Sequence, residues 1–384
     1  MSPGRSAIEG RLDIRVAPKR AAVSVLSTRP TLASRLFEGR TIDETLKLMP
    51  LVFNVCGQAQ SVAAVRAIES AIGETPNGDV QHARVILQRL ETLREHLWRV
   101  LFEWPEFCGG ERANASLGRI TQDVQALKQL IDPEQMVCRW PGLQRFALNL
   151  DELRPLAEHL RQSVASQVFG GDIATWLHHD QDAFLAWADT SPSPAAQLLK
   201  FVRRRAWESL GNAKMATLPK SVERELTAIL SAEGADVFVA QPTWKNQTRE
   251  TGPSARQAAH PLMKAIGRRF GNGLLWRLTA RLIEIAELSS VLLDTEKPPR
   301  GQTGFAQLEA ARGRLCHYVE LEGEKVSRYR ILAPTEWNFH PSGVAVRTLT
   351  SVRAADESTA QLQARLLVHS IDPCVGYDLH IEES

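Results

Sequence analysis

Apolar and polar positions follow two different patterns along this chain. Through its middle, apolar residues recur at three- and four-residue spacing, which predicts amphipathic helices. The longest of these covers residues 80–102, with apolar side chains at Val85, Leu90, Leu93 and Leu97. Further helices are predicted over residues 59–72, 120–131, 148–169, 195–210, 222–232, 274–293 and 359–369.

Strand patterns lie toward the two ends of the chain. Residues 8–16 alternate apolar and polar side chains, and residues 21–26 are their expected hairpin partner. Residues 315–321 and 326–332 flank a glycine-containing loop, which predicts a second hairpin, and residues 344–352 are interpreted as a third strand. We expect the strands near the two termini to pair with one another. The predicted fold is α+β, mainly α, in a single domain: a β segment (1–30), a helical body (31–300) and a C-terminal part (301–384).

Composition narrows the classes of function. The 384 residues include 46 basic and 44 acidic side chains, so the net charge of +2 gives no nucleic-acid signature. Three consecutive arginines at 203–205 are interpreted as a solvated helix face, with binding of an acidic partner as the alternative. No stretch approaches the roughly 20 apolar residues that cross a bilayer, and the first residues do not form a secretory signal. Five unevenly spaced cysteines without a C-x-x-C pair predict a reducing, cytoplasmic setting.

Two of the cysteines stand in positions that suit metal binding. Cys56 comes immediately before a predicted helix, where unpaired amides and the helix dipole are expected to lower the pKa of a thiol. The following Gly57 is expected to let a bulky group approach the backbone. Cys374 follows Asp372 and Pro373 near the end of the sequence. Taken singly, each cysteine is best interpreted as a small buried side chain.

Six short motifs, taken together, change that interpretation. They are, in order, Ile8-Glu9-Gly10-Arg11, Val55-Cys56-Gly57-Gln58-Ala59, Gly252-Pro253-Ser254-Ala255-Arg256, Glu309-Ala310-Ala311-Arg312-Gly313, Pro334-Thr335-Glu336-Trp337-Asn338 and His369-Ser370-Ile371-Asp372-Pro373-Cys374. Nickel-iron hydrogenase large subunits carry, in the same order, R-I-E-G-H, R-x-C-G-x-C-x-x-x-H, G-P-L-A-R, E-A-P-R-G, P-T-T-W-N and H-S-F-D-P-C-x-x-C-x-x-H. The chain therefore resembles this family over nearly its whole length, which implies one domain with a hydrogenase large-subunit-like helical body.

The departures from the family pattern bear on function. In the family, four cysteines hold nickel, and the second cysteine of each pair also bridges to an iron that carries cyanide and carbon monoxide. Those bridging positions are Ala59 and Tyr377 here, and the histidine of the first motif is replaced by Ala63. The retained thiols, Cys56 and Cys374, match the terminal nickel ligands. A phenol does not replace a thiolate as a soft-metal ligand. The resemblance therefore implies that this chain is not an enzyme and does not bind nickel.

The resemblance extends to the HupK/HoxV group of hydrogenase maturation proteins, which implies a non-catalytic scaffold. On this hypothesis Cys56 and Cys374 hold an Fe(CN)2(CO) unit transiently, and Arg312, the pocket arginine of the family motif, donates hydrogen bonds to a cyanide. Glu9 matches a glutamate of the family pocket, and His380 is a further candidate metal ligand. The expected partners are a small HypC-type chaperone and the apo large subunit of a nickel-iron hydrogenase. Only four residues follow His380, so we do not expect a precursor that awaits nickel-dependent cleavage.

An alternative from another class is a structural, metal-free subunit of an oxidoreductase complex. The quinone-site subunit of respiratory complex I is related to hydrogenases and has lost all the metal cysteines. That relative keeps neither thiol, whereas this chain keeps one of each pair, Cys56 and Cys374. The retained pair favours the maturation scaffold.

Overall fold

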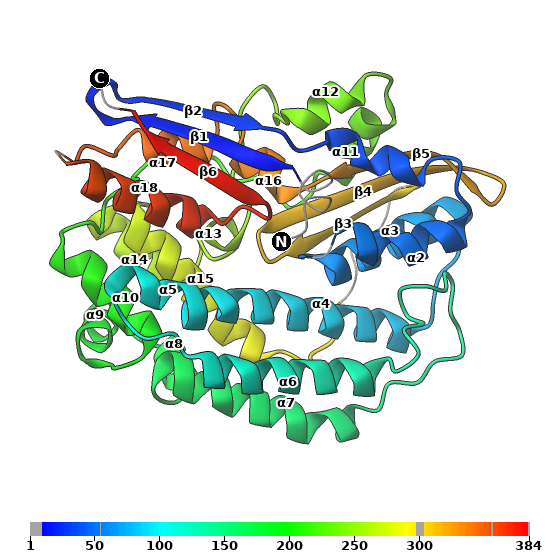
Figure 1. Cartoon of the computed structure of the whole chain (residues 1–384). Helices are drawn as coiled ribbons and strands as arrows, with labels where there is room; N and C mark the ends of the chain where they lie inside the picture. The colour runs from blue at the N-terminus through cyan, green and yellow to red at the C-terminus, as the bar shows by residue number, and fades with distance from the viewer. Residues whose placement is uncertain (1–9, 54, 297–302, 355, 383–384) are drawn as a thin grey trace.

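The computed structural model of this protein describes residues 10–53, 55–296, 303–354 and 356–382 (Figure 1). The strands are β1 (Arg11–Ala17), β2 (Ala22–Ser27), β3 (Phe305–Ala310), β4 (Gly313–Glu322), β5 (Lys325–Leu332) and β6 (Gly376–Ile381). The α-helices are α2 (Ile42–Val52), α3 (Gly57–Ile72), α4 (Gly78–Trp98), α5 (Trp104–Cys108), α6 (Asn114–Ile131), α7 (Leu150–Val164), α8 (Ile173–Leu177), α9 (Gln181–Thr190), α10 (Pro194–Arg204), α11 (Glu223–Ser231), α12 (Ala235–Ala240), α13 (Pro253–Arg256), α14 (Pro261–Phe270), α15 (Leu274–Ser290), α16 (Pro334–Asn338), α17 (Val344–Leu349) and α18 (Glu357–Ile371). Two 3₁₀ segments, η1 (Pro18–Arg20) and η2 (Thr31–Phe37), and two π-helical segments, η3 (Arg99–Glu103) and η4 (Ala165–Phe169), complete the described elements.

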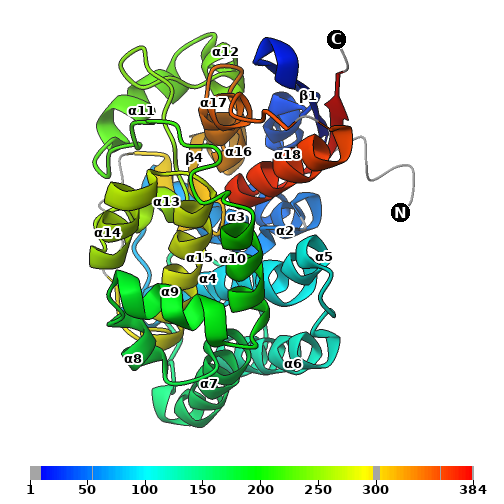
Figure 2. The same cartoon turned by 90° about the vertical axis from the view of Figure 1, so that its left-hand side faces the viewer.

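The helical body is built around α4. This helix begins at the Asn77 cap, whose side chain accepts a hydrogen bond from the amide of Val80, and it continues through η3 into α5. Helix α6 lies beside it, with α7 packed on the far side of α6, and α15 also packs against α4 (Figures 1 and 2). A helix is found at each predicted position, although the one predicted over 195–210 ends at Arg204, and the apolar stripes of these helices are buried.

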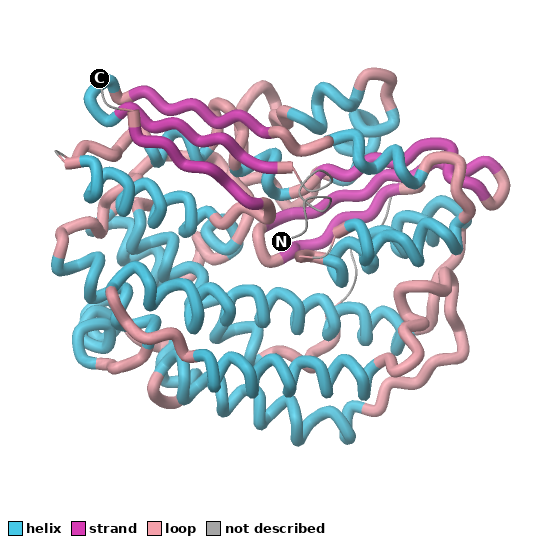
Figure 3. Tube along the Cα trace, in the orientation of Figure 1, coloured by secondary structure: helices cyan, strands magenta, loops and turns pink. Residues whose placement is uncertain are grey.

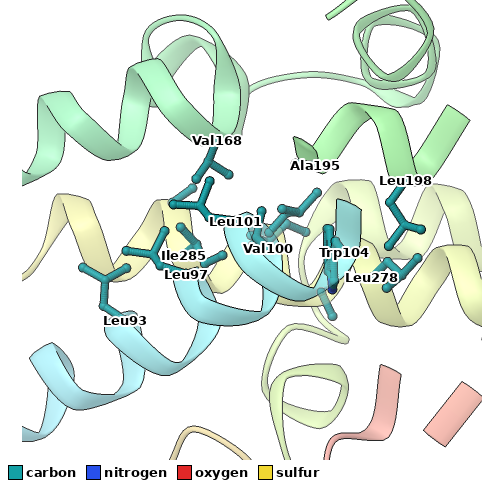
Figure 4. Packing of buried hydrophobic residues seen from close by; sticks show 14 of the residues in the cluster. Leu93, Leu97, Val100, Leu101, Trp104, Val168, Ala195, Leu198, Leu278 and Ile285 are labelled. Carbon is teal, nitrogen blue, oxygen red and sulfur yellow. The ribbon is translucent and has the colours of Figure 1, made fainter. Parts of the chain in front are cut away.

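The main apolar core lies where α4, η3 and α5 contact α10, α15 and η4. Figure 4 shows the apolar side chains between these helices, with the fully buried Trp104 beside Leu198 and Leu278. They include Leu93, Leu97, Val100, Leu101, Val168, Ala195, Leu198, Leu278 and Ile285. Dense packing of this kind holds α4 rigidly, and α4 carries charged side chains on another face.

Two separate three-stranded sheets flank the helices (Figure 3). In the first, β1 pairs antiparallel with β2 and parallel with β6, with Leu12 opposite Tyr377. In the second, β4 lies between β3 and β5, and all pairs are antiparallel. Helix α3 packs on β3 and β4. The predicted α+β class with mainly helical content is confirmed.

Two details of the strand prediction need correction. Residues 344–349 form α17 rather than a strand, because Val344, Ala345, Thr348 and Leu349 share one buried face at helical spacing. The N-terminal strands do pair near the C-terminus, but with β6, which was not predicted, while the β4–β5 hairpin belongs to the other sheet.

This arrangement brings distant segments of the chain together. Helix α18 ends in a turn that leads into β6. The start of β6 lies beside the turn that joins β3 to β4 (Figure 1). Among the described residues, no helix has both the length and the apolar character needed to cross a bilayer.

Candidate functional site

A cavity of about 70 Å³ lies where α3, α4, the β3–β4 turn and the α18–β6 turn meet. Cys56, Cys374 and Arg312 all line it, so the structure brings these three sequence-predicted residues together. One water needs about 10–15 Å³ of such space, so the cavity has room for a small polyatomic group. Typical pockets for organic cofactors are several times larger, about 300 Å³ or more.

Cys56 is the N-cap residue of α3, as the sequence predicted, but the expected effect on its thiol is wrong. The carboxylate of Glu91 accepts hydrogen bonds from the amides of Gln58 (2.8 Å) and Ala59 (2.9 Å) and so occupies the helix N-terminus. Burial, the sulfur of Cys374 and the Glu91 carboxylate together raise the pKa of the Cys56 thiol. The thiol is therefore protonated at neutral pH, and a metal must displace its proton to bind.

Gly57 does not face the cavity, which corrects the prediction that it admits a bulky group. A Cβ at this position would lie 3.4 Å from the carbonyl oxygen of Pro50, an ordinary contact with α2. Gly57 therefore belongs to the packing of α2 against α3, and the cavity wall at this point is formed by Val55, Cys56 and Gln60.

Glu91 makes a testable contribution to stability. We expect Glu91→Gln to lower the free energy of unfolding by about 1–2 kcal/mol, because a neutral amide caps the two α3 amides less well than a carboxylate does. Urea denaturation measures this change. Glu225→Gln is the matched control, because Glu225 lies in the first turn of α11 but is exposed. Equal losses in the two variants would contradict the capping role of Glu91.

Cys374 lies in the turn between α18 and β6 and has polar neighbours of its own. Its sulfur lies 2.9 Å from the hydroxyl of Thr335 and accepts a hydrogen bond from Nη1 of Arg29 at 3.5 Å. Arg29 also forms an ion pair of 2.9 Å with the buried carboxylate of Glu336. Cys374 therefore lies beside a cation, whereas Cys56 lies beside the carboxylate of Glu91.

Arg312 is held where three of the family-like motifs meet. Its backbone carbonyl accepts a hydrogen bond from the side-chain amide nitrogen of Asn338 at 3.1 Å. The side-chain oxygen of Asn338 accepts one from the backbone amide of Thr251 at 3.0 Å. A Cβ at Gly252, where φ is +119°, would come within 3.0 Å of the Arg312 carbonyl oxygen. A glycine is therefore required at this position.

The guanidinium of Arg312 is fixed by two carboxylates. Its Nη atoms donate to Glu95 at 3.2 Å, and its Nε donates to Asp372 at 3.3 Å. Burial opposes the charge, but Asp372 and Glu95 outweigh it and raise the pKa of Arg312 above its usual value. Arg312 therefore remains a cation at the cavity wall.

Asp372 is the centre of the charge network behind the cavity. Its carboxylate contacts the guanidinium groups of Arg99 (2.8 Å), Arg281 (3.3 Å) and Arg312 (3.3 Å). Although Asp372 is buried, these three cations hold its pKa well below its usual value. The residue ends α18 with a left-handed φ of +70°, which turns the chain so that Cys374 lines the cavity.

The other sequence-predicted residues lie elsewhere. His380 is exposed on β6 opposite Arg15, and Tyr377 is half-buried on the same strand; neither lines the cavity. Glu9 lies outside the described residues. Within the described ranges, no group of three or more His, Cys, Asp or Glu side chains is placed to hold a metal ion.

Sequence reasoning missed several residues of the cavity wall. Glu91 and Glu95 lie one turn apart on α4, and Arg99 and Glu103 continue the same four-residue spacing. This run of charged residues beside the apolar stripe of a buried helix could have marked Glu91 and Glu95 as candidate site residues. Arg29 lies in a connecting segment and Thr335 in the short helix α16, and no sequence pattern marked either as a neighbour of Cys374.

Known proteins resemble this chain in sequence and in fold. The family described as nickel-dependent hydrogenase matches residues 271–380. The hydrogenase expression/formation protein HoxV of Cupriavidus necator is 30% identical over 98% of this chain and 97% of its own length. HupK of Azotobacter vinelandii, which carries the same description, is 30% identical over 97% and 98%. The chain belongs to the HupK/HoxV family of hydrogenase expression/formation proteins.

The fold of this family member is that of hydrogenase large subunits. A chain of the nickel-iron-selenium hydrogenase of D. vulgaris Hildenborough superposes with a TM-score of 0.62 over 96% of this chain and 97% of that one. The two sequences are only 15% identical, so this likeness concerns the fold alone. The family-like motifs that meet at Arg312 thus lie in a hydrogenase-type fold, with Ala59 and Tyr377 at two positions where thiols were expected.

Proposed function

We propose that this protein is a non-catalytic scaffold of hydrogenase maturation that holds an Fe(CN)2(CO) unit before its transfer to an apo large subunit. The names of the nearly full-length relatives, hydrogenase expression/formation proteins, support a role in maturation. The observation that carries the finer proposal is that Cys56, Cys374 and Arg312 line one small cavity. We treat the iron unit as cargo and not as a resident cofactor.

The chemistry of the cavity wall suits this cargo. Thiolates are soft ligands, and an iron that brings three diatomic ligands needs few from the protein. Two cysteines, Cys56 and Cys374, meet that need. Arg312, kept charged by Asp372 and Glu95, supplies donors for the nitrogen of a cyanide. Apolar side chains, among them Val55, Leu315 and Ile331, suit the weakly polar carbonyl.

The same wall argues against hydrogen activation. The enzyme's nickel site needs four sulfur ligands, and within the described part of the chain no third cysteine lines the cavity. Tyr377, at a bridging position of the family motif, lies on β6 and is absent from the wall. We therefore propose that nickel is not retained and that the protein is not an enzyme.

The proposed partners follow from the path of the cargo. A small HypC-type chaperone would deliver the iron unit, and the apo large subunit of a nickel-iron hydrogenase would receive it. All five cysteines are free thiols, which fits assembly in the reducing cytoplasm. Fewer protein ligands than the enzyme provides should also allow the cargo to leave.

Infrared spectroscopy tests the scaffold directly. Protein purified without oxygen from cells that express the maturation machinery should show cyanide and carbonyl stretching bands. Cys56→Ser and Cys374→Ser should each abolish these bands, because a serine hydroxyl is a poor soft-metal ligand. Cys108→Ser is the matched control, because Cys108 lies on α5 away from the cavity and should leave the bands unchanged.

Two outcomes would contradict the proposal. The first is a wild-type protein without diatomic bands, and the second is full hydrogenase activity in cells that carry both cysteine variants. A stable stoichiometric complex with iron-sulfur subunits would then favour the alternative, a structural subunit of an oxidoreductase.

A further inference from the structure

A buried hydrogen-bond chain runs from the second sheet to the sulfur of Cys56. The hydroxyl of Tyr329 on β5 lies 2.8 Å from Nδ1 of His317 on β4. Nε2 of His317 lies 2.8 Å from Oε1 of Gln60 on α3. Nε2 of Gln60 then lies 3.6 Å from Sγ of Cys56. Tyr329, His317 and Gln60 are each almost fully buried, so the protein alone sets the geometry.

The orientation of the Gln60 amide sets the direction of each bond in this chain, because its oxygen faces His317 and its nitrogen faces Cys56. Burial lowers the pKa of His317 to about 3, so the imidazole is neutral and carries one N–H. The amide oxygen of Gln60 can only accept, so the proton of His317 is on Nε2 and Nδ1 accepts from the Tyr329 hydroxyl. The amide nitrogen of Gln60 faces Cys56 and donates to its sulfur.

The two retained cysteines share this feature. The sulfur of Cys374 also accepts a hydrogen bond from a protein donor, the guanidinium of Arg29. A hydrogen bond to a thiolate withdraws electron density from the lone pairs that bind a metal. Each retained sulfur is therefore a weaker ligand than the same thiolate without its donor.

We infer that Gln60, oriented by His317 and Tyr329, is a positioning residue that weakens the bond between Cys56 and iron and so makes the cargo easier to release. This inference rests on the proposed function, and it concerns how firmly the iron unit is held. Gln60 forms part of the cavity wall, whereas His317 and Tyr329 lie behind it, so a change at His317 can act on the sulfur without touching the diatomic ligands.

Gln60→Met tests the inference, because methionine keeps the length of the side chain and has no N–H. The Cys56 thiolate should then donate more charge to iron, and the carbonyl band should shift to lower wavenumber. Release of the iron unit to apo large subunit should slow roughly fivefold, the effect expected for one lost hydrogen bond. His317→Phe should shift the band in the same direction, because it removes the partner that orients Gln60.

Gln58→Met is the matched control. Gln58 lies in the first turn of the same helix, but its side-chain amide donates to the sulfur of Cys138 at 3.3 Å. Neither Gln58 nor Cys138 lines the cavity. Thermal unfolding of each variant shows whether it is folded. A carbonyl band and a release rate unchanged in both Gln60→Met and His317→Phe would overturn the inference and leave the scaffold intact. A wild-type protein without bands would overturn the proposed function, and the inference with it.

Discussion

Replacing Asp372 by asparagine is expected to lower the free energy of unfolding by about 3–5 kcal/mol, the effect of breaking a buried ion pair by removing one partner. The reason is that Arg99, Arg281 and Arg312 all contact this carboxylate, at 2.8–3.3 Å. The substitution removes the shared anion of two buried guanidinium groups, Arg281 and Arg312, and of the half-buried Arg99. Asparagine tolerates the left-handed backbone found here (φ +70°), so the change tests charge and not conformation. Urea denaturation measures the loss.

Asp378→Asn provides the control for that measurement. Asp378 accepts two hydrogen bonds from Arg11, at 2.9 and 2.7 Å, but this pair lies on the exposed face of the first sheet. Exposed pairs contribute little to stability, so the variant should unfold like the wild type. In Asp372→Asn, the diatomic bands of the proposed cargo should also weaken, because Arg312 and the turn that carries Cys374 lose their anchor. Equal stability of the two variants would contradict the central role of Asp372.

The helical part of this fold was predictable because its core depends on regular spacing. The stripe at Leu90, Leu93 and Leu97 is buried against α15 and its neighbours, and hydrophobic period alone identifies such a helix. The structure of residues 344–349 was harder to predict. Val344 and Val346 favour a strand by propensity, yet burial of Val344, Thr348 and Leu349 on one face produces a helix.

Strand β6 was missed for a different reason. Tyr377, Leu379 and Ile381 alternate with exposed residues, the period of a half-buried strand, but the segment was interpreted only as the end of a metal motif. The strand bears on the site, because it places Tyr377 and His380 in a sheet and leaves Cys374 in the preceding turn.

In the candidate site too, local sequence patterns predict some features and miss others. The motifs identified Cys56, Cys374 and Arg312, and the structure places all three around one cavity. The electrostatic environment was not predictable from a local pattern. The carboxylate of Glu91 accepts hydrogen bonds from the α3 amides that were expected to act on Cys56. Glu91 lies on another helix, 35 residues after Cys56 in the sequence. Long-range contacts of this kind decide a pKa, and local spacing does not encode them.

Mild acid is expected to destabilise this protein, and His317 accounts for a defined part of the effect. Burial lowers the pKa of His317 to about 3 in the folded state, against an ordinary value of about 6.5. As the pH falls below 6.5, the unfolded chain binds a proton that the folded protein does not, so the free energy of unfolding decreases toward pH 3. Linkage gives a loss of about 2 kcal/mol between pH 7 and pH 5 from His317 alone. Urea denaturation at the two pH values measures it.

Other groups add to this acid sensitivity and can be separated from it. Burial also lowers the pKa values of His96 and His369, so both act in the same direction as His317. Glu284, whose pKa is lowered to about 2 despite burial because Arg256 and His96 contact it, loses its contribution only below about pH 4.5.

In His317→Phe, the difference in stability between pH 7 and pH 5 should therefore shrink by about 2 kcal/mol. In His380→Asn, which alters an exposed histidine of β6, the difference should stay as in the wild type. An unchanged difference in His317→Phe would show that the imidazole accepts a proton in the folded protein, and the one-way hydrogen-bond chain to Cys56 would then be wrong.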